Sequence, residues 1–281
     1  ALYPSLVQVC TDPTYPRGLK GVKAQAALTL TREGETLTAG QGEVLFTEYG
    51  VSGPAVFDLS RQAATGGDGL TLHLDFLPGW SREDTLTWLR SQRTALSRQE
   101  AGALLTGSVH PRLGRMLCKA AGISGGQPVS ELTDRQLEAL CRQVRELTLP
   151  VTGTCGFDQA QVTAGGLRTG EFDPRTMESR LVPGFYACGE VLDIDGDCGG
   201  FNLQWAWASG WRDGCYTFNK EGGCAYETGS PVGPSVPVRH RRPGGGPGPG
   251  KRAGPGDRGV LLCPQSGGPG GAVRRPGGYG G

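Results

Sequence analysis

The residues best suited to chemistry lie within residues 184–210, which read GFYACGEVLDIDGDCGGFNLQWAWASG. Three apolar residues, 185–187, predict a short buried strand. Gly189 and Glu190 follow it, where glycine lets the backbone approach a ligand and a carboxylate can accept hydrogen bonds from sugar hydroxyls. This order of strand, glycine and acid is typical of a segment that holds a nucleotide cofactor.

A pair of glycines opens the next predicted element. Gly199 and Gly200 precede a helix that we expect to begin near Asn202. The first turn of a helix carries unpaired N–H groups and a partial positive charge. This helix start therefore suits a phosphate or the electron-rich edge of a flavin.

Four blocks of sequence resemble one protein family. AQVTAGGL (residues 160–167), TMESRLVPGFYACGEVLDIDGDCGGFN (176–202) and QWAWASG (204–210) resemble the C-terminal signature of the BaiN/YhiN-type, or aminoacetone oxidase-like, FAD-dependent oxidoreductases. GEVLFTEYGVSGPAVFDLS (42–60) resembles the LFT-x-x-G-x-SGP motif in the inserted domain of that family. The likeness covers roughly residues 1–218, and its motifs are far more specific than a lone glycine pattern.

The resemblance implies an enzyme that transfers hydride between the N5 position of FAD and a small organic substrate. NAD(P)H is compatible with this chemistry as the electron donor. The substrate class stays open between an activated carbon–carbon double bond and a small amine or alcohol. For the VTAGG loop, residues 162–166, a plain turn at the end of a strand is the alternative to a flavin contact. The implied cofactor-binding residues are Thr163, Ala164, Gly165, Gly166, Gly189, Glu190, Asp195, Gly199, Gly200, Phe201 and Asn202.

The sequence does not identify the general acid of such a reaction. The resemblance places FTEYGVSGP near the flavin, which makes Glu48, Tyr49 and Ser52 the candidate catalytic residues. Many members of the family carry histidine at the position of Glu48. The sequence around Ser52 lacks the second glycine of a nucleophile elbow, so Gly53 and Pro54 predict a turn instead.

The predicted fold is a mixture of α/β and α+β: an incomplete FAD-binding Rossmann-like domain with an inserted β-barrel or sheet, a helical module and a disordered C-terminal tail. The glycine-rich G-x-G-x-x-G turn that opens such FAD domains does not occur here, so we expect the C-terminal part of a longer enzyme. The expected boundaries are 1–79 (β-rich part of the insertion), 80–148 (its helical part), 149–218 (C-terminal part of the FAD domain) and 219–281 (tail).

The periodicity of apolar residues changes from two to that of a helix near Ser81. Helices are then expected around a capping-box pattern, SRQE at residues 97–100, and before Pro150, which should end the last helix. Alternating residues predict strands at 6–10, 22–31, 35–39, 42–46 and 69–76, which together would form a small sheet or barrel. One stripe of the last helix comprises Leu137, Leu140, Cys141, Val144 and Leu147.

The C-terminal residues differ sharply in composition from the rest. Residues 229–281 hold 18 of the 49 glycines and 10 of the 20 prolines, and eight basic residues face a single acid, Asp257. Such a segment cannot bury enough apolar surface to offset chain entropy, so we expect disorder. A translated shifted reading frame would also explain it, and the Arg/Gly content suggests a weaker alternative, salt-sensitive RNA binding.

The residue types that bind metals are scattered. The nine cysteines show no C-x-x-C spacing, and the three histidines share no cluster with acids or cysteines. Asp193, Asp195 and Asp197 lack the glycine and the distant glutamate of a calcium loop, so we predict no metal site. We expect these acids to shape a turn through side-chain to backbone hydrogen bonds, with contact to the substrate or the ribose as the alternative for one of them. Cys198 beside the expected flavin is more typical of a packed thiol than of a redox group. Trp205 and Trp207 are expected to pack on the helix that follows Asn202, with a place beside the flavin ring as the alternative for one of them.

The remaining expectations concern location and partners. With no signal peptide and no apolar run long enough for a transmembrane helix, we expect a cytoplasmic protein with reduced thiols, a small-molecule substrate, no membrane partner and no nucleic-acid partner. The competing class is a non-catalytic protein, a truncated chain that cannot bind FAD alone. An RNA-binding protein acting through the Arg/Gly-rich tail is the third alternative.

Overall fold

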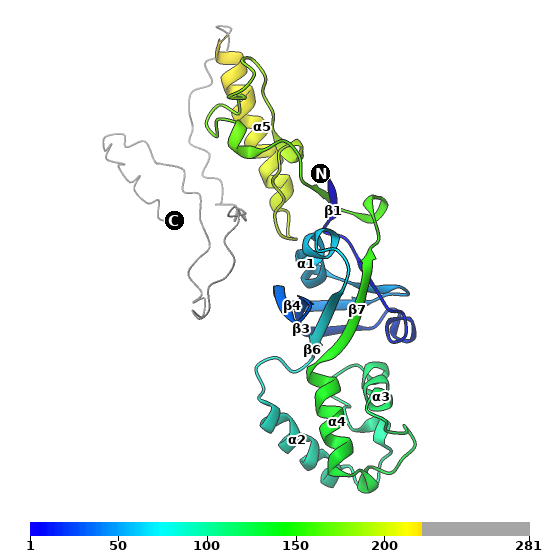
Figure 1. Ribbon diagram of the computed structural model, residues 1–281. Coiled ribbons are helices and arrows are strands. Elements are labelled where there is room, and N and C mark those ends of the chain that lie inside the picture. Colours follow the sequence, from blue (N-terminus) through cyan, green and yellow to red (C-terminus); the bar gives the residue numbers. More distant parts are fainter. Residues whose placement is uncertain (221–281) are drawn as a thin grey trace, which may run out of the picture.

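The computed structural model describes residues 1–220, with side chains up to residue 214. The expectations of disorder, a shifted frame and RNA binding for the C-terminal tail concern residues that lie outside this described part, apart from its first two residues. Figure 1 shows three parts stacked along one axis: a helical module, a β-barrel and a lobe around the last helix. The fold is therefore mixed, as the sequence predicts.

The middle part is a closed antiparallel barrel in the strand order β2-β5-β4-β3-β6-β7. Along β3 and β6 buried residues alternate with more exposed ones, which is the pattern of strands with one face toward a core. The predicted barrel is confirmed, but its strands differ in detail. The two strands expected at 35–39 and 42–46 are one continuous strand, and β5 and β7 complete the barrel at segments where the sequence predicts no strand. The strands are β2 (Val9–Thr11), β3 (Lys23–Arg32), β4 (Glu35–Phe46), β5 (Gly50–Ser52), β6 (Leu70–Asp75) and β7 (Leu147–Thr154).

Helix α1 (Pro54–Thr65) lies directly on the barrel strand β4. A Cβ atom at Gly53, which has φ +110°, would lie 2.6 Å from the carbonyl oxygen of Glu43. Only glycine fits this close approach of the turn to the strand. Pro54 then occupies the first helical turn, where its missing N–H costs nothing. The GP step of the SGP motif therefore sets where α1 begins.

The helical module is inserted between β6 and β7. It contains α2 (Arg82–Ala95), α3 (Pro111–Ala120) and α4 (Asp134–Arg145). Capping boxes start α2 at Ser81 and α4 at Thr133. Four residues of the predicted apolar stripe, Leu137, Leu140, Cys141 and Val144, lie buried on α4 as expected. The fifth is wrong: Leu147 is buried as the first residue of β7, because α4 already ends at Arg145.

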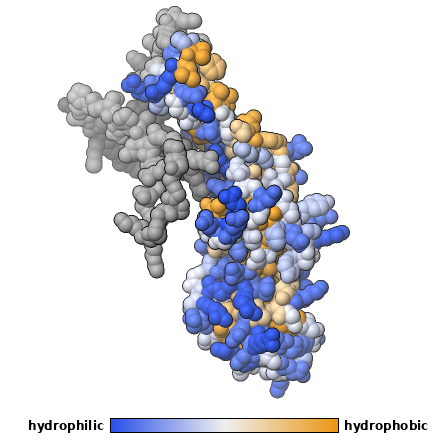
Figure 2. All heavy atoms as spheres, in the orientation of Figure 1, coloured by the Kyte–Doolittle hydropathy of each residue, from blue (hydrophilic) through white to orange (hydrophobic). Residues whose placement is uncertain are grey.

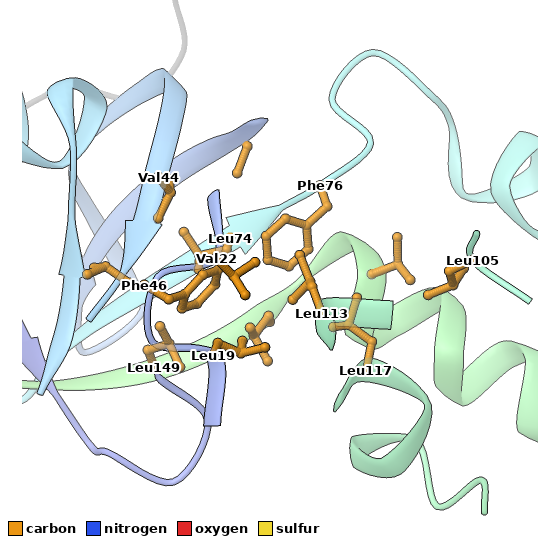
Figure 3. Close-up of a cluster of buried hydrophobic side chains, with 14 of the residues drawn as sticks. Leu19, Val22, Val44, Phe46, Leu74, Phe76, Leu105, Leu113, Leu117 and Leu149 are labelled. Carbon is orange, nitrogen blue, oxygen red and sulfur yellow. The ribbon is translucent and has the colours of Figure 1, made fainter. Parts of the chain in front are cut away.

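One hydrophobic cluster runs from the barrel interior into the helical module. Figure 3 shows Leu113 and Leu117 of α3 beside Phe76, which follows β6, with Phe46 deeper in the barrel. Phe46, Leu113 and Leu117 have no solvent exposure. The barrel and the helical module therefore share a core and support each other.

The third part is built mostly from turns around a long helix. Strand β1 (Tyr3–Ser5) pairs with β8 (Val162–Ala164), and the helix is α5 (Phe201–Lys220). A small second core, Phe172, Met177, Ala187 and Leu192, packs with Leu167 and Trp205.

Within residues 1–220 no helix combines the length and apolar character needed to cross a bilayer. Short 3-10 turns are η1 (Pro16–Leu19), η2 (Ala101–Ala103), η3 (Val129–Glu131), η4 (Phe157–Gln159), η5 (Thr169–Glu171) and η6 (Gly189–Val191).

The strand predicted at residues 185–187 is wrong. Tyr186 forms a single isolated bridge with Glu178, and Phe185 is 45% exposed. A strand needs a neighbouring ladder, and in the described part of the chain this segment meets its neighbour at only one residue pair. The strand predicted at 6–10 is shorter at its start, because Leu6 adopts φ +48° in the connection between β1 and β2 and the strand begins only at Val9.

Two predicted helix signals are also wrong. Residues 97–100 form a turn that leads to the short η2, because the backbone of Ala101 and Gly102 bonds to the 125–127 segment instead of continuing a helix. Pro150 does not end the last helix, which stops at Arg145. It lies within β7 opposite Thr71, and its carbonyl accepts a hydrogen bond from the N–H of Asp12.

Truncating the shared core should destabilise both parts that meet there. We expect Leu113→Ala to lower the free energy of unfolding by about 2–5 kcal/mol, because a buried side chain is replaced by a cavity. Leu37→Ala, at a β4 side chain that is 37% exposed, is the control and should cost less than about 0.5 kcal/mol. Urea denaturation followed by circular dichroism measures both, and equal effects would contradict a common core at Leu113.

The capping box of α4 offers a second test. Thr133→Ala removes the hydroxyl that accepts from the N–H of Gln136 and should cost about 1 kcal/mol of unfolding free energy. Thr94→Ala is the matched control, since this exposed hydroxyl bonds only to a carbonyl within its own helix, at Arg90. A Thr133→Ala protein as stable as the control in thermal denaturation would show that the cap contributes nothing.

Candidate functional site

The turn before α5 carries Asp193, Asp195 and Asp197 and is called the acidic turn below. Ion pairs with Arg61 hold it against α1. The guanidinium of Arg61 contacts the Asp195 carboxylate and lies 3.3 Å from an oxygen of Asp193. The Asp195 side chain is only 6% exposed and also accepts a hydrogen bond of 3.1 Å from the Ser5 hydroxyl. A carboxylate withdrawn from water needs such partners, so the turn cannot leave α1 without a large electrostatic cost.

A second contact joins the same two elements. The N–H of Cys198 donates to the carboxylate of Asp58 at 2.8 Å. Asp58 and Arg61 are three residues apart on α1 and therefore share a face of the helix. The sequence analysis did not single out either residue. The available signal was a pair of charged residues three positions apart on the helix that follows the SGP motif.

Asn202 holds the other end of the turn. Its side-chain oxygen accepts from the N–H of Gly196 at 2.8 Å, and its amide donates back to the Gly196 carbonyl at 3.0 Å. Gly199 and Gly200 have φ of +132° and +89°, which let the chain reverse into α5. Helix α5 begins at Phe201, as the sequence predicts near Asn202.

The space around these glycines differs from that around the VTAGG glycines. A Cβ atom at Gly200 would meet no protein atom within 4 Å. At Gly165 and Gly166 it would lie 2.2 Å from the Ala1 carbonyl oxygen and 2.4 Å from the Val191 carbonyl oxygen. Glycine is therefore required at Gly165 and Gly166 because other backbone segments of the protein lie too close for a side chain. At Gly200, by contrast, no protein atom occupies the space where a side chain would begin.

Glu190 connects the two glycine-containing segments. Its carboxylate accepts from the N–H of Thr163 in β8 at 2.6 Å. The carbonyl of Val191, the next residue, accepts from the N–H of Leu167 just beyond the VTAGG loop at 2.8 Å. The predicted ligand acid therefore has a partner within the protein, and Thr163 and Glu190 lie together.

Gly189 packs against the middle of α5. Its N–H donates to the Ser209 hydroxyl at 2.8 Å, and its carbonyl accepts from the Trp205 indole N–H at 3.0 Å. Trp205 packs as expected, but the expectation for Trp207 is wrong, since its side chain is 78% exposed. Leu203, Trp207 and Trp211 recur at the four-residue helical spacing on the stripe of α5 that points away from the second core, and Figure 2 shows apolar residues gathered over this lobe.

The three candidate catalytic residues lie in a different place, at the β4–β5 turn and along β5. Glu48 pairs with Lys20 at 2.9 Å, and this hydrogen bond and positive charge hold its pKa below the ordinary value. Glu48 is therefore ionised at neutral pH and is poorly suited to donate a proton. Tyr49 is 62% exposed, and Ser52 lies on β5 opposite Leu45.

Metal and thiol chemistry have little support within the described residues. No group of three or more His, Cys, Asp or Glu side chains in this part could hold a metal ion. The carboxylates of Asp193 and Asp195 form ion pairs with Arg61, whereas the sequence predicted that these acids would bond to the backbone of their own turn. Burial, and then the negative charge of Asp58, raise the pKa of the Cys198 thiol, so it keeps its proton.

Breaking the contact between α1 and the acidic turn should loosen the start of α5. We expect Arg61→Met to lower the free energy of unfolding by about 1–3 kcal/mol, because Asp195 keeps its buried charge but loses its cation. Hydrogen–deuterium exchange at residues 193–202 should accelerate, since the Gly196 and Cys198 amides are held by this turn. The control is Arg175→Met, where the arginine side chain is 80% exposed and the pairing distance is 3.9 Å. Unchanged exchange at 193–202 in Arg61→Met would contradict the role of the pair.

Comparison with family models gives two matches that together span most of the described chain. The model described as HI0933-like protein barrel and H2TH domain matches residues 3–162. The model described as HI0933-like protein Rossmann domain matches residues 125–216. The first match corresponds to the barrel and the helical module, and the second ends within α5.

Curated relatives agree with these matches. A 3-dehydro-bile acid delta(4,6)-reductase of Clostridium scindens is 37% identical over 214 residues, which are 75% of this chain and 52% of the relative. Ribosomal RNA dihydrouridine synthases of Escherichia coli and Haemophilus influenzae are 35% and 30% identical, over 69% and 59% of this chain and 46% and 40% of theirs. The chain spans about half the length of the curated relatives it matches. A family match over more than half of its residues, together with this identity, shows that the chain belongs to the HI0933-like family.

Proposed function

We propose that this chain takes part in FAD-dependent oxidoreduction, with hydride passing between the flavin and a small organic substrate. The observation that carries the proposal is the glycine-opened start of α5, which lies inside the segment matched by the family's Rossmann-domain model. The reductase among its relatives supports the same reaction class. FAD, when bound, would supply the hydride chemistry, and the protein would supply binding and orientation.

The residues at the start of α5 fit a flavin or phosphate edge. The first amides of a helix have no partner within the helix and carry a partial positive charge. Gly200 leaves open space in front of them, because a Cβ there would meet nothing within 4 Å. We therefore assign Gly199, Gly200, Phe201 and Asn202 to the cofactor through their backbone, with Asn202 also holding the turn.

The other predicted cofactor residues have supporting roles in this proposal. Asp195 is engaged by Arg61 and Ser5, so it positions the turn. Glu190 and Thr163 are bonded to each other and would present one edge of the site together. Gly165 and Gly166 hold the backbone of that edge in place through their close contacts, and Gly189 does so through its hydrogen bonds to Ser209 and Trp205. Ala164 is fully buried in β8.

The substrate follows from the relatives only as a class. Their names describe reduction of a bile-acid derivative and formation of dihydrouridine, and both products arise by adding hydrogen across a carbon–carbon double bond next to a carbonyl-bearing system. We propose an activated double bond as the reacting group and NAD(P)H as the electron donor. A small molecule comes first because the bile-acid reductase matches the larger share of this chain. Ribosomal RNA is the second candidate substrate, on the names of the other two relatives.

Flavin retention tests the proposal directly. The purified full chain is saturated with FAD, freed of excess cofactor by gel filtration and examined for visible flavin absorbance. We expect retained flavin, and we expect Gly200→Ala to weaken FAD binding by about tenfold or more, since a side chain at φ +89° strains the helix start by roughly 1–3 kcal/mol.

The matched control is Gly170→Ala, which also adds a Cβ into open space but at a residue without a positive φ. Circular dichroism establishes that both variants are folded. A folded wild-type chain that stays colourless would overturn the proposal for this chain and favour the non-catalytic alternative. Equal affinity in the two variants would remove the start of α5 from the site.

A further inference from the structure

Two half-buried cysteines meet on neighbouring strands of the barrel. Cys10 lies in β2, and Cys155 directly follows β7. Their sulfur atoms are 3.1 Å apart, which is hydrogen-bond distance for thiols. The antiparallel pairing of Val9 with Thr154 and the bond from the Cys155 N–H to the Gln8 carbonyl hold the backbones on both sides of the pair. The two thiols are thus held together by the sheet, so neither needs a change of strand register to reach the other.

The pair lies where the chain leaves the barrel. One connection runs from β1 to β2, and the other runs from β7 to β8. Beyond the cysteines the same two connections pair again as β1 with β8. Figure 1 shows β1 and the end of β7 leading toward the lobe of α5. A bond between the cysteines would therefore clamp both connections at the point of exit.

The other described cysteines are placed differently. Cys118 and Cys141 are buried in the helical module, and burial raises the pKa of Cys118 to about 11. The Cys118 thiol instead donates to the Ala101 carbonyl, at 3.4 Å. Cys188 and Cys198 belong to the lobe of α5. Among the cysteines up to residue 214, Cys10 and Cys155 are the pair whose sulfur atoms lie within hydrogen-bond distance of each other.

We propose that Cys10 and Cys155 form a reversible disulfide that links β2 to β7 when the protein meets a peroxide. This inference does not depend on the proposed flavin chemistry. Burial and the hydrogen bond to Cys155 raise the pKa of Cys10 to about 12, so the Cys10 thiol keeps its proton at neutral pH.

The reaction balances with one peroxide per disulfide. One of the two sulfurs attacks one oxygen of hydrogen peroxide as its thiolate. The O–O bond breaks, and the departing hydroxide takes up the proton that this thiol had released, so that a sulfenic acid and water result. The other sulfur then attacks the sulfenic sulfur, transfers its proton to the departing hydroxide and releases a second water. Two thiols lose two electrons in total, and the peroxide gains them. A dithiol reductant restores both thiols.

Peptide mapping tests the bond in the intact protein. The full chain is treated with hydrogen peroxide, alkylated under denaturing conditions and digested without reductant. We expect one linked species whose mass is that of the Cys10 and Cys155 peptides minus two hydrogen atoms, and we expect dithiothreitol to remove it. Oxidation should also raise the melting temperature by at least ~4 °C, because the bond closes a long loop.

Three variants sharpen the result. Cys10→Ser and Cys155→Ser should abolish the linked species and the rise in melting temperature, while Cys188→Ser, a half-buried cysteine elsewhere, should keep both. If Cys10 or Cys155 is found linked to a different cysteine, or both stay fully alkylated at peroxide concentrations that oxidise Cys188, the proposal is wrong. The wild-type mapping decides the question even where a serine variant fails to fold.

Discussion

The ion pair between Arg61 and Asp195 is the interaction on which the candidate site depends. Asp195 is almost withdrawn from water, and a carboxylate in such a place is stable only with partners, here Arg61 and the Ser5 hydroxyl. Arg61 belongs to the helix that packs on the barrel, whereas Asp195 belongs to the turn before α5. The pair therefore holds the start of α5 in a defined position relative to the barrel.

Backbone geometry then determines how the lobe around α5 is arranged. Gly165 and Gly166 allow two segments to touch at distances that no side chain would permit, and Gly199 and Gly200 reverse the chain into the helix. Asn202 closes this reversal with two hydrogen bonds to Gly196. Glycines that look alike in the sequence thus serve two different purposes, close packing at the VTAGG loop and an open helix start at Gly200.

The barrel and helical module provide a firm base for this lobe. Their shared core includes Phe46 and Leu113, both without solvent exposure, so the inserted helices cannot shift without disturbing the barrel. Among the residues up to 214, the lobe has only four buried residues in its second core, and it relies more on specific hydrogen bonds such as those of Gly189 with Trp205 and Ser209. Apolar burial in this part of the chain is therefore uneven and is concentrated in the barrel and the helical module.

The sequence by itself determined the features that depend on local pattern: four of the six barrel strands from alternation, most of the buried stripe of α4 from helical spacing, the start of α5 from its paired glycines, and the family from its motifs. Only the tertiary structure decided the features that depend on distant partners. The segment at 185–187 is continuously apolar like a buried strand, yet it forms one bridge instead of a ladder. Arg61 and Asp58 show no function until a turn more than 130 residues away meets them. Cys10 and Cys155 likewise become neighbours only because β2 pairs with β7, since side-chain chemistry is local in space and a linear sequence records only neighbours along the chain.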